Sequence, residues 1–236
     1  SVITQNKEEF HYQTLLLAMG TEPKHLRFSD NDIIYYRGYA DYLKLKELVE
    51  KADNFAVIGA GFIGSEIAAA LNLNNKKVTL LESGTGIGWR VFPPEIVEYL
   101  NDFYQAKGVK VIEGANIRDI KNVDGRHQVL LKNGQPINVD GIISGVGVRP
   151  NVQFAEKAGI YVEDGIKVNS YLETSAPGVF AAGDVAAFHS SALDKTLRIE
   201  HNDNAKQMGW VAGLNMAGGN QEYDYLPMFY SDLFDI

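Results

Sequence analysis

Three glycines and one glutamate have the residue types and the spacing needed to hold a nucleotide. Gly59, Gly61 and Gly64 form a G-x-G-x-x-G turn, and Glu82 ends a later apolar stretch. Gly59 allows a tight turn, Gly61 lets a pyrophosphate approach the backbone, and Gly64 lets a helix pack closely on a strand. The carboxylate of Glu82 can accept hydrogen bonds from both hydroxyls of a ribose, and it repels a 2′-phosphate. Together these residues predict a site that prefers NADH over NADPH.

The segments around these residues are those of a βαβ unit. Asn54–Ile58 is a short apolar strand, the run after Gly64 is helix-like, and Val78–Glu82 is a second strand. The amides and the partial positive charge at the start of that helix favour phosphate groups. A glycine motif alone is weak, so the interpretation depends on the strand, the helix and the acid together. The alternative is a coincidental glycine turn in an α/β core.

The composition bounds the class of protein. The chain has 236 residues, of which 45% are hydrophobic, and this suits one large or two small domains. A net charge of −8 disfavours nucleic acid and anionic membranes as partners. The chain has no cysteine, which excludes disulfides and a catalytic thiol of its own. The histidines lack zinc spacing, and no apolar run approaches the ~20 residues of a membrane span. We therefore expect no metal site and no integral membrane segment.

Other segments read as further α/β elements. Two turn signals, Asp124-Gly125 and Asn133-Gly134, predict a small antiparallel meander between residues 116 and 139. The remaining expected elements are strands within Tyr12–Gly20, Val109–Glu113, Gly141–Gly147 and Gly178–Asp184, and helices over Asp41–Lys51, Glu95–Lys107 and Ala205–Met216.

Four motifs stand in a fixed order along the chain: Leu16–Gly20, Gly59–Glu66, Gly145–Pro150 and Phe180–Asp184. This order resembles that of the pyridine nucleotide–disulfide oxidoreductase superfamily of flavoproteins. In that superfamily one Rossmann-like domain binds FAD, and a second, inserted into it, binds NAD(P)H. The resemblance implies an α/β fold with two Rossmann-like domains, the NAD domain complete and the FAD domain partial.

The same resemblance implies domain boundaries. Residues 1–50 and 148–225 would belong to the FAD-binding domain, 51–147 to the NAD-binding domain, and 226–236 to the start of a C-terminal interface domain. A single G-x-G-x-x-G motif is present, so the FAD βαβ unit would precede residue 1. The C-terminal domain would follow residue 236. We therefore expect the chain to be a fragment of a larger flavoprotein.

A narrower resemblance is to the apoptosis-inducing-factor-like branch. It is carried by Gly61–Glu66, by Arg198–His201 with Asp203, and by Met228–Asp232. Ferredoxin reductases of the superfamily usually have leucine at the position of Ser65, whereas the apoptosis-inducing factors usually have tryptophan at the position of Tyr230.

By resemblance, specific residues bind the two cofactors. Gly183 and Asp184 match a signature whose carboxylate bonds a ribityl hydroxyl of FAD. Glu200 and His201 match the pair that flanks the nicotinamide and the isoalloxazine, and Gly147 matches a glycine that passes the nicotinamide. The expected cofactor-binding residues are Gly59, Gly61, Phe62, Ile63, Gly64, Glu66, Glu82, Gly147, Gly183, Asp184, Glu200 and His201. No catalytic residue is assigned, because hydride transfer needs little proton chemistry from the protein.

Simpler readings remain open for several of these residues. Asp184 could be a turn or N-cap residue, and Glu66 could be a carboxylate that stabilises the first turn of a helix. Phe62 could be a core aromatic, and His201 could lie in a solvated turn. Trp89 is expected to be a packing residue.

The implied function is that of a FAD-dependent NADH oxidoreductase. It would pass hydride from NADH to FAD, and then electrons to a quinone, an electron carrier or oxygen. The alternatives are a ferredoxin or rubredoxin reductase, a redox-sensing interaction protein with slow turnover, and an NAD-binding module alone. We expect a small-molecule or small-protein electron acceptor, a possible homodimer of the full-length protein, and a bacterial-type cytoplasmic rather than mitochondrial location.

Overall fold

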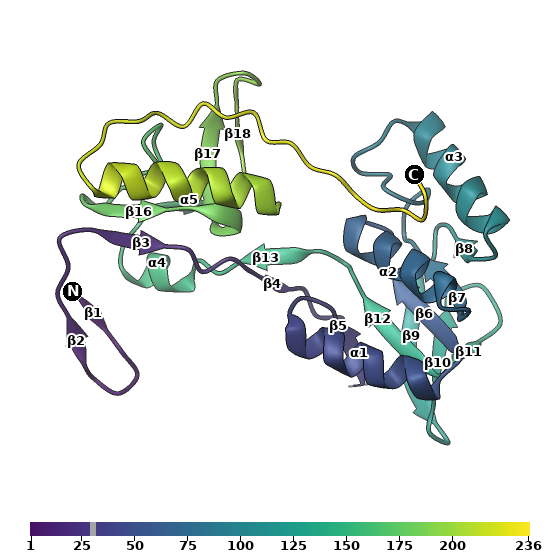
Figure 1. Ribbon diagram of the computed structural model, residues 1–236. Helices are drawn as coiled ribbons and strands as arrows, with labels where there is room; N and C mark the ends of the chain where they lie inside the picture. Colours follow the sequence, from purple (N-terminus) through teal and green to yellow (C-terminus); the bar gives the residue numbers. More distant parts are fainter. Residues whose placement is uncertain (29–31) are drawn as a thin grey trace. The chain divides into compact units, whose positions relative to one another are not determined.

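The computed structural model describes residues 1–28 and 32–236, and the chain divides into two compact units (Figure 1). The first unit comprises residues 1–22 and 149–230, and the second comprises 23–148 and 231–236. Strands β4 (Thr21–Pro23) and β13 (Val148–Pro150) pair where the chain passes from one unit to the other.

The second unit is built on a five-stranded parallel sheet. In spatial order its strands are β5 (Ile33–Tyr35), β12 (Gly141–Ser144), β6 (Asn54–Ile58), β7 (Lys77–Leu81) and β8 (Lys110–Ile112). From β6 the chain proceeds to β7 and β8 on one side and returns through β12 on the other. In open parallel sheets, ligands bind beyond the carboxyl ends of the strands at such a reversal.

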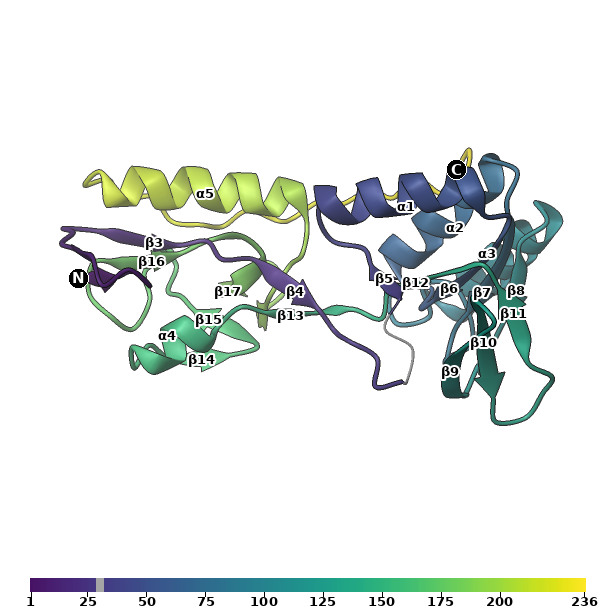
Figure 2. The same ribbon diagram turned by 90° about the horizontal axis from the view of Figure 1, so that it is seen from below.

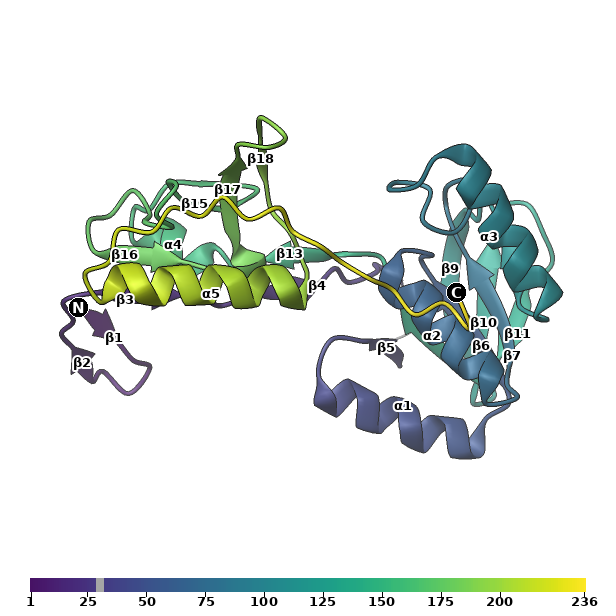
Figure 3. The same cartoon turned by 45° about the horizontal axis from the view of Figure 1, so that its top comes forward.

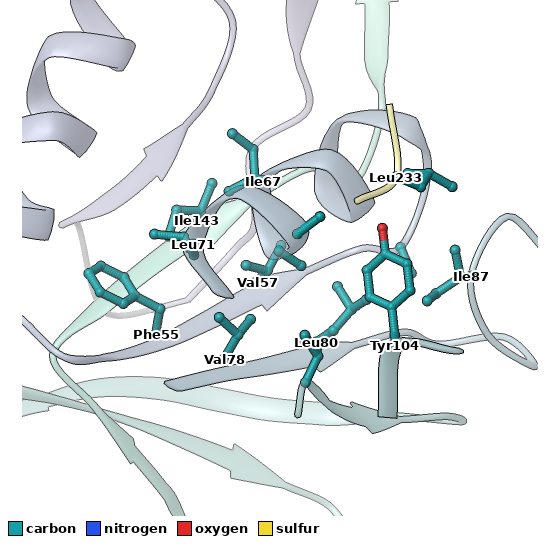
Figure 4. Packing of buried hydrophobic residues seen from close by; sticks show 14 of the residues in the cluster. Phe55, Val57, Ile67, Leu71, Val78, Leu80, Ile87, Tyr104, Ile143 and Leu233 are labelled. Atoms are coloured by element: carbon teal, nitrogen blue, oxygen red, sulfur yellow. The ribbon is translucent and has the colours of Figure 1, made fainter. Parts of the chain in front are cut away.

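Both faces of this sheet are buried, because alternate residues of a strand point to opposite sides. Phe55 and Val57 of β6 pack against helices α1 (Tyr39–Lys51), α2 (Phe62–Leu73) and α3 (Pro94–Ala106). Figure 4 shows Phe55 and Val57 within this cluster, together with Tyr104 of α3 and Leu233.

The opposite face is covered by an antiparallel meander. Its strands are β9 (Ile117–Val123), β10 (Arg126–Leu131) and β11 (Ile137–Val139), and their buried residues pack against Ala56 and Ile58. Figure 2 shows α1 and α2 on one side of the sheet and the meander on the other. The meander predicted from the two turn signals is therefore confirmed.

The first unit has a smaller core. Strands β3 (Leu15–Leu17) and β16 (Val179–Ala181) pair in parallel, and helix α5 (Asn202–Met216) runs beside them (Figure 3). Met208 and Ala212 of α5 are completely buried in this core, together with Ala155 of the short helix α4 (Gln153–Lys157).

Short strands complete the first unit. The hairpin of β1 (Val2–Ile3) and β2 (Glu9–Phe10) precedes β3. A four-stranded sheet has the order β14 (Val162–Glu163), β15 (Gly165–Lys167), β17 (Ala186–Ser190) and β18 (Lys195–Leu197), and a 3-10 turn at Gly183–Val185 connects β16 to β17.

The boundaries of the compact units differ from those of the expected domains at residues 23–50. This segment groups with the second unit, because β5 pairs in parallel with β12. Leu45 of α1 also packs into the core between the sheet and helices α1, α2 and α3, which we call the helix-side core. No helix among the described residues is long and apolar enough to cross a membrane.

Candidate dinucleotide-binding site

The glycine turn joins the carboxyl end of β6 to the start of α2. Gly59 has a positive φ of 93°, and a Cβ on Gly64 would fall inside the carbonyl of Gly59. Only glycine permits this approach, which seats the first turn of α2 directly over the strand. Around Gly61, by contrast, a Cβ would meet nothing within 4 Å. The turn therefore has one tightly packed face and one open face, as a pyrophosphate site requires.

A second glycine segment lies against this turn. The amide of Gly145, just beyond β12, donates to the carbonyl of Ile58 at 2.8 Å. A Cβ on Gly59 would lie 2.6 Å from the carbonyl oxygen of Gly145. The loop after β12 thus packs backbone to backbone on the glycine turn at the reversal of strand order.

Glu82 lies at the carboxyl end of β7 and is only 7% exposed. Its Oε2 accepts a hydrogen bond from the amide of Ala60 at 2.7 Å, within the glycine turn. Its Oε1 accepts from the Ser83 hydroxyl at 3.0 Å, the Gly84 amide at 2.9 Å and the Trp89 indole at 3.1 Å. The structure therefore brings the predicted acid and the predicted glycines into one hydrogen-bonded site.

These bonds set the charge of Glu82. Burial is the largest single influence and acts to raise the pKa of the carboxyl. The hydrogen bonds from Ala60, Gly84, Ser83 and Trp89 together outweigh burial, so the pKa lies below its ordinary value. Glu82 is consequently an anion at neutral pH.

This shift predicts a component of stability that depends on pH. The contribution of Glu82 is complete above its unfolded-state pKa of about 4.5 and is lost as the pH falls through the lower folded-state value. At neutral pH we expect Glu82→Gln to lower the free energy of unfolding by about 2 kcal/mol, because charged hydrogen bonds are lost. Urea unfolding at neutral and acidic pH should show this difference shrink in acid, and a constant difference would contradict the assignment.

The loop from Ser83 to Pro93 forms part of the site and was not predicted to do so. The amide of Gly88 donates to the carbonyl of Ala60 at 2.8 Å. Buried Asn101 of α3 holds the loop, because it accepts from the Ile87 amide at 3.0 Å and donates to the carbonyl of Thr85 at 3.0 Å. The available sequence signal was the alternation of glycines at 84, 86 and 88 before an aromatic residue, which is typical of a closely packed loop.

Phe62 and Ile63 lie in the first turn of α2, and Glu66 follows in the second turn. Phe62 is 36% exposed and meets the ring of Phe92 edge-on at 6.1 Å, while Ile63 is 38% exposed. Glu66 accepts a hydrogen bond from the Ser231 hydroxyl at 2.7 Å. The hydroxyl of buried Ser65 donates to the carbonyl of Gly61 at 2.8 Å. Serine at this position therefore braces the glycine turn from within.

Gly147 lies further along the β12 loop, with a positive φ of 94°. Its carbonyl accepts from the amide of Lys24 at 2.9 Å, and a Cβ would lie 3.9 Å from the Lys24 ammonium. No hydrogen bond joins Gly147 to the glycine turn in the described contacts.

The residues expected to bind FAD lie in the first unit. Gly183 has a positive φ of 75°, and a Cβ there would lie 3.5 Å from that of Ala205 in the first turn of α5. The guanidinium of Arg198 donates to the Asp184 carbonyl at 3.2 Å and to the Glu200 carboxylate at 2.6 Å. Arg198 therefore joins the Gly-Asp turn to the segment that leads into α5.

His201 is the N-cap of α5. Its Nδ1 accepts from the amide of Asp203 at 3.2 Å, and its ring meets those of Phe229 and Tyr230 edge-on at 6.3 and 5.5 Å. This capping role explains why α5 begins at Asn202, three residues earlier than the sequence predicted, because histidine supplied a cap that is not among the usual types.

The glycine turn fits a dinucleotide. Gly61 leaves open backbone beside the amides of the first turn of α2, and Glu82 supplies a buried anion one strand away. Bound there, the nicotinamide nucleotide would supply a hydride. In the first unit, the Gly183–Asp184 turn lies beside the start of α5.

Comparisons with known proteins agree with this geometry. The family model described as pyridine nucleotide-disulphide oxidoreductase matches residues 1–209. The chain is 34% identical over 248 residues to a monodehydroascorbate reductase of Pisum sativum, covering 98% of this chain and 57% of that protein. The chain thus spans little more than half the length of this relative.

Solved structures share the fold. A ferredoxin reductase from Rhodopseudomonas palustris is 32% identical, with a TM-score of 0.92, over 98% of this chain and 58% of that one. The reductase in a covalent putidaredoxin reductase–putidaredoxin complex is 28% identical, with a TM-score of 0.93, over 99% of this chain and 58% of that one. The expected α/β class and the expected cofactor classes, FAD and a nicotinamide nucleotide, are those of these flavoprotein reductases. From the match over residues 1–209 and from these relatives, the chain belongs to the pyridine nucleotide-disulphide oxidoreductase family.

Proposed function

We propose that this chain is the nucleotide-binding part of a FAD-dependent NADH oxidoreductase. The second unit would bind NADH, and the first unit would belong to the FAD-binding domain. The observation that carries the proposal is Glu82, an ionised and buried carboxylate bonded at 2.7 Å to the amide of Ala60 in the glycine turn. An anion in this position suits a ribose with free hydroxyls and opposes a 2′-phosphate.

The chain's own residues would bind and orient the coenzyme. Gly61 and the start of α2 would hold the pyrophosphate, while Glu82 would hold the adenosine ribose. By the family resemblance, Phe62 and Glu66 would lie beside the nicotinamide, and Asp184, Glu200 and His201 would serve the flavin. None of these residues needs to move a proton, because the reaction transfers hydride.

The electron acceptor we propose is a small molecule or a small electron-carrier protein. The Pisum sativum relative is a monodehydroascorbate reductase, and the putidaredoxin reductase was solved in a complex with putidaredoxin. These relatives support both acceptor classes. The narrower membership in the apoptosis-inducing-factor-like branch stays a prediction, carried by Gly61–Glu66, Arg198–His201 with Asp203, and Met228–Asp232. The cytoplasmic location, the redox-sensor alternative and the homodimer also stay predictions.

The direct test is an absorbance spectrum of the purified full-length protein, before and after NADH is added. Bleaching of the flavin band near neutral pH, followed by recovery when an acceptor is added, supports the oxidoreductase. Flavin that binds but is reoxidised only slowly by every acceptor would favour the redox sensor. Protein that binds NADH but no flavin would favour the NAD-binding module.

Removal of the Glu82 carboxylate should change coenzyme choice. We expect Glu82→Ala to weaken NADH binding about tenfold, because a charge-assisted hydrogen bond to the ribose is lost. NADPH binding should change less or improve, because repulsion of the 2′-phosphate disappears. Calorimetric titration with both coenzymes measures the ratio, and unchanged constants for both would remove Glu82 from the site.

A further inference from the structure

The two oxygens of the Glu82 carboxylate are used unequally. Oε1 accepts three hydrogen bonds, from Ser83, Gly84 and Trp89, at 2.9 to 3.1 Å. Oε2 accepts from the Ala60 amide at 2.7 Å. Because a carboxylate oxygen has about two lone-pair sites, Oε1 is filled, and the capacity to accept a further donor lies on Oε2.

Of the donors to the filled oxygen, Trp89 lies furthest along the chain from Glu82, and the loop leaves room for its ring. A Cβ on Gly84 would fall inside the indole, so glycine at this position lets the ring lie flat against the backbone. The guanidinium of Arg90 lies 5.0 Å from the centre of the ring. Asn101 fixes the backbone before the ring through Thr85 and Ile87. The indole therefore lies against the backbone of Gly84, and the guanidinium of Arg90 lies over its ring.

We propose that Trp89 is a positioning residue for ribose recognition, because its indole N–H holds Oε1 of Glu82 and thereby directs Oε2 to a ribose hydroxyl. This inference rests on the proposed function, since it assumes that Glu82 meets the ribose.

The chemistry of indole suits this role. An indole N–H can donate but cannot accept, so it favours the ionised form of the carboxyl. Ionised Glu82 can accept one further hydrogen bond on Oε2, from a ribose hydroxyl, whereas a protonated carboxyl would itself need an acceptor. Loss of the indole N–H would leave Oε1 held by Ser83 and Gly84 alone, which would loosen the carboxylate and raise its pKa. Coenzyme affinity would then fall, and would fall further in acid.

The test compares Trp89→Phe with Trp210→Phe by calorimetric titration of NADH into the protein. Trp89→Phe keeps an aromatic ring over Gly84 and removes the N–H. Trp210 lies on α5 in the first unit and is 70% exposed, so its replacement is a matched control. We expect the Kd for NADH to rise about fivefold in Trp89→Phe and to stay unchanged in Trp210→Phe. Ser83→Ala removes another donor from the same oxygen and should change the Kd in the same direction.

The pH profile separates positioning from simple packing. In Trp89→Phe the loss of NADH affinity on acidification should begin at a higher pH than in the wild type, because the pKa of Glu82 rises. A ring that only packs would weaken binding by the same factor at every pH. If the wild type and Glu82→Gln differ in NADH affinity but Trp89→Phe keeps the wild-type constants and profile, the inference is overturned and the proposed function stands. If the wild type binds no NADH, both are overturned.

Discussion

Replacement of Gly61 by alanine is expected to weaken NADH binding by at least about 30-fold, or about 2 kcal/mol, while the protein stays folded. The backbone at Gly61 has φ −74° and ψ −172°, which alanine adopts freely, and an added Cβ would meet nothing within 4 Å. The methyl group would occupy the space that the pyrophosphate needs. Because Gly61 is the N-cap of α2, the free energy of unfolding should fall by less than about 1 kcal/mol.

Calorimetric titration and urea unfolding of Gly61→Ala measure the two effects separately. Wild-type affinity in this variant would show that no phosphate approaches the turn at Gly61. A large loss of stability would show instead that the open face is filled by the protein itself.

Gly64→Ala, unlike Gly61→Ala, should mainly lower the stability of the protein, because the added methyl group clashes with the backbone. The Cβ would fall inside the carbonyl of Gly59, and that backbone is fixed by Gly145 on its other side. Helix α2 must therefore move off β6, and we expect a loss of stability of about 3 kcal/mol from this overpacking. Hydrogen exchange of the α2 amides measures the loss locally, which suits a chain of two units.

Gly209→Ala provides the control for Gly64→Ala. Gly209 lies within α5, where a Cβ would meet nothing within 4 Å. The same replacement should therefore stabilise α5 by about 0.5–1 kcal/mol, because alanine is the better helix former. Protection of the α2 amides in Gly64→Ala that equals the wild type would contradict the close packing of Gly64 on Gly59.

Elements whose local sequence pattern matches the fold were predicted correctly. Strand Asn54–Ile58 was predicted with its exact bounds, and helix Asp41–Lys51 was predicted to within two residues of its observed start at Tyr39. The glycine turn and Glu82 were predicted as one site because their types and order follow from the ligand's chemistry. Each of these features is specified by residues that are close in sequence.

Features set by distant contacts were missed. Strand β5 is three residues long, and its place in the sheet depends on pairing with β12, which lies more than a hundred residues later. The short helix α4 and the β1–β2 hairpin have too few residues for a periodic pattern to be recognised. Trp89 was expected to be a packing residue, because only the folded loop places its N–H beside Glu82.

Residues 231–236 belong to the second unit and help to close its core. Leu233 is buried in the helix-side core, Phe234 lies edge-on to Tyr104 at 4.9 Å, and Asp235 pairs with Lys107 at 2.9 Å. Because residues 231–236 close this core, it cannot be completed until that segment has been synthesised, and residues 149–230 of the first unit come before it. During synthesis, the apolar residues of α2 and α3 that Leu233 and Phe234 cover would therefore stay exposed until residues 149–230 had been made.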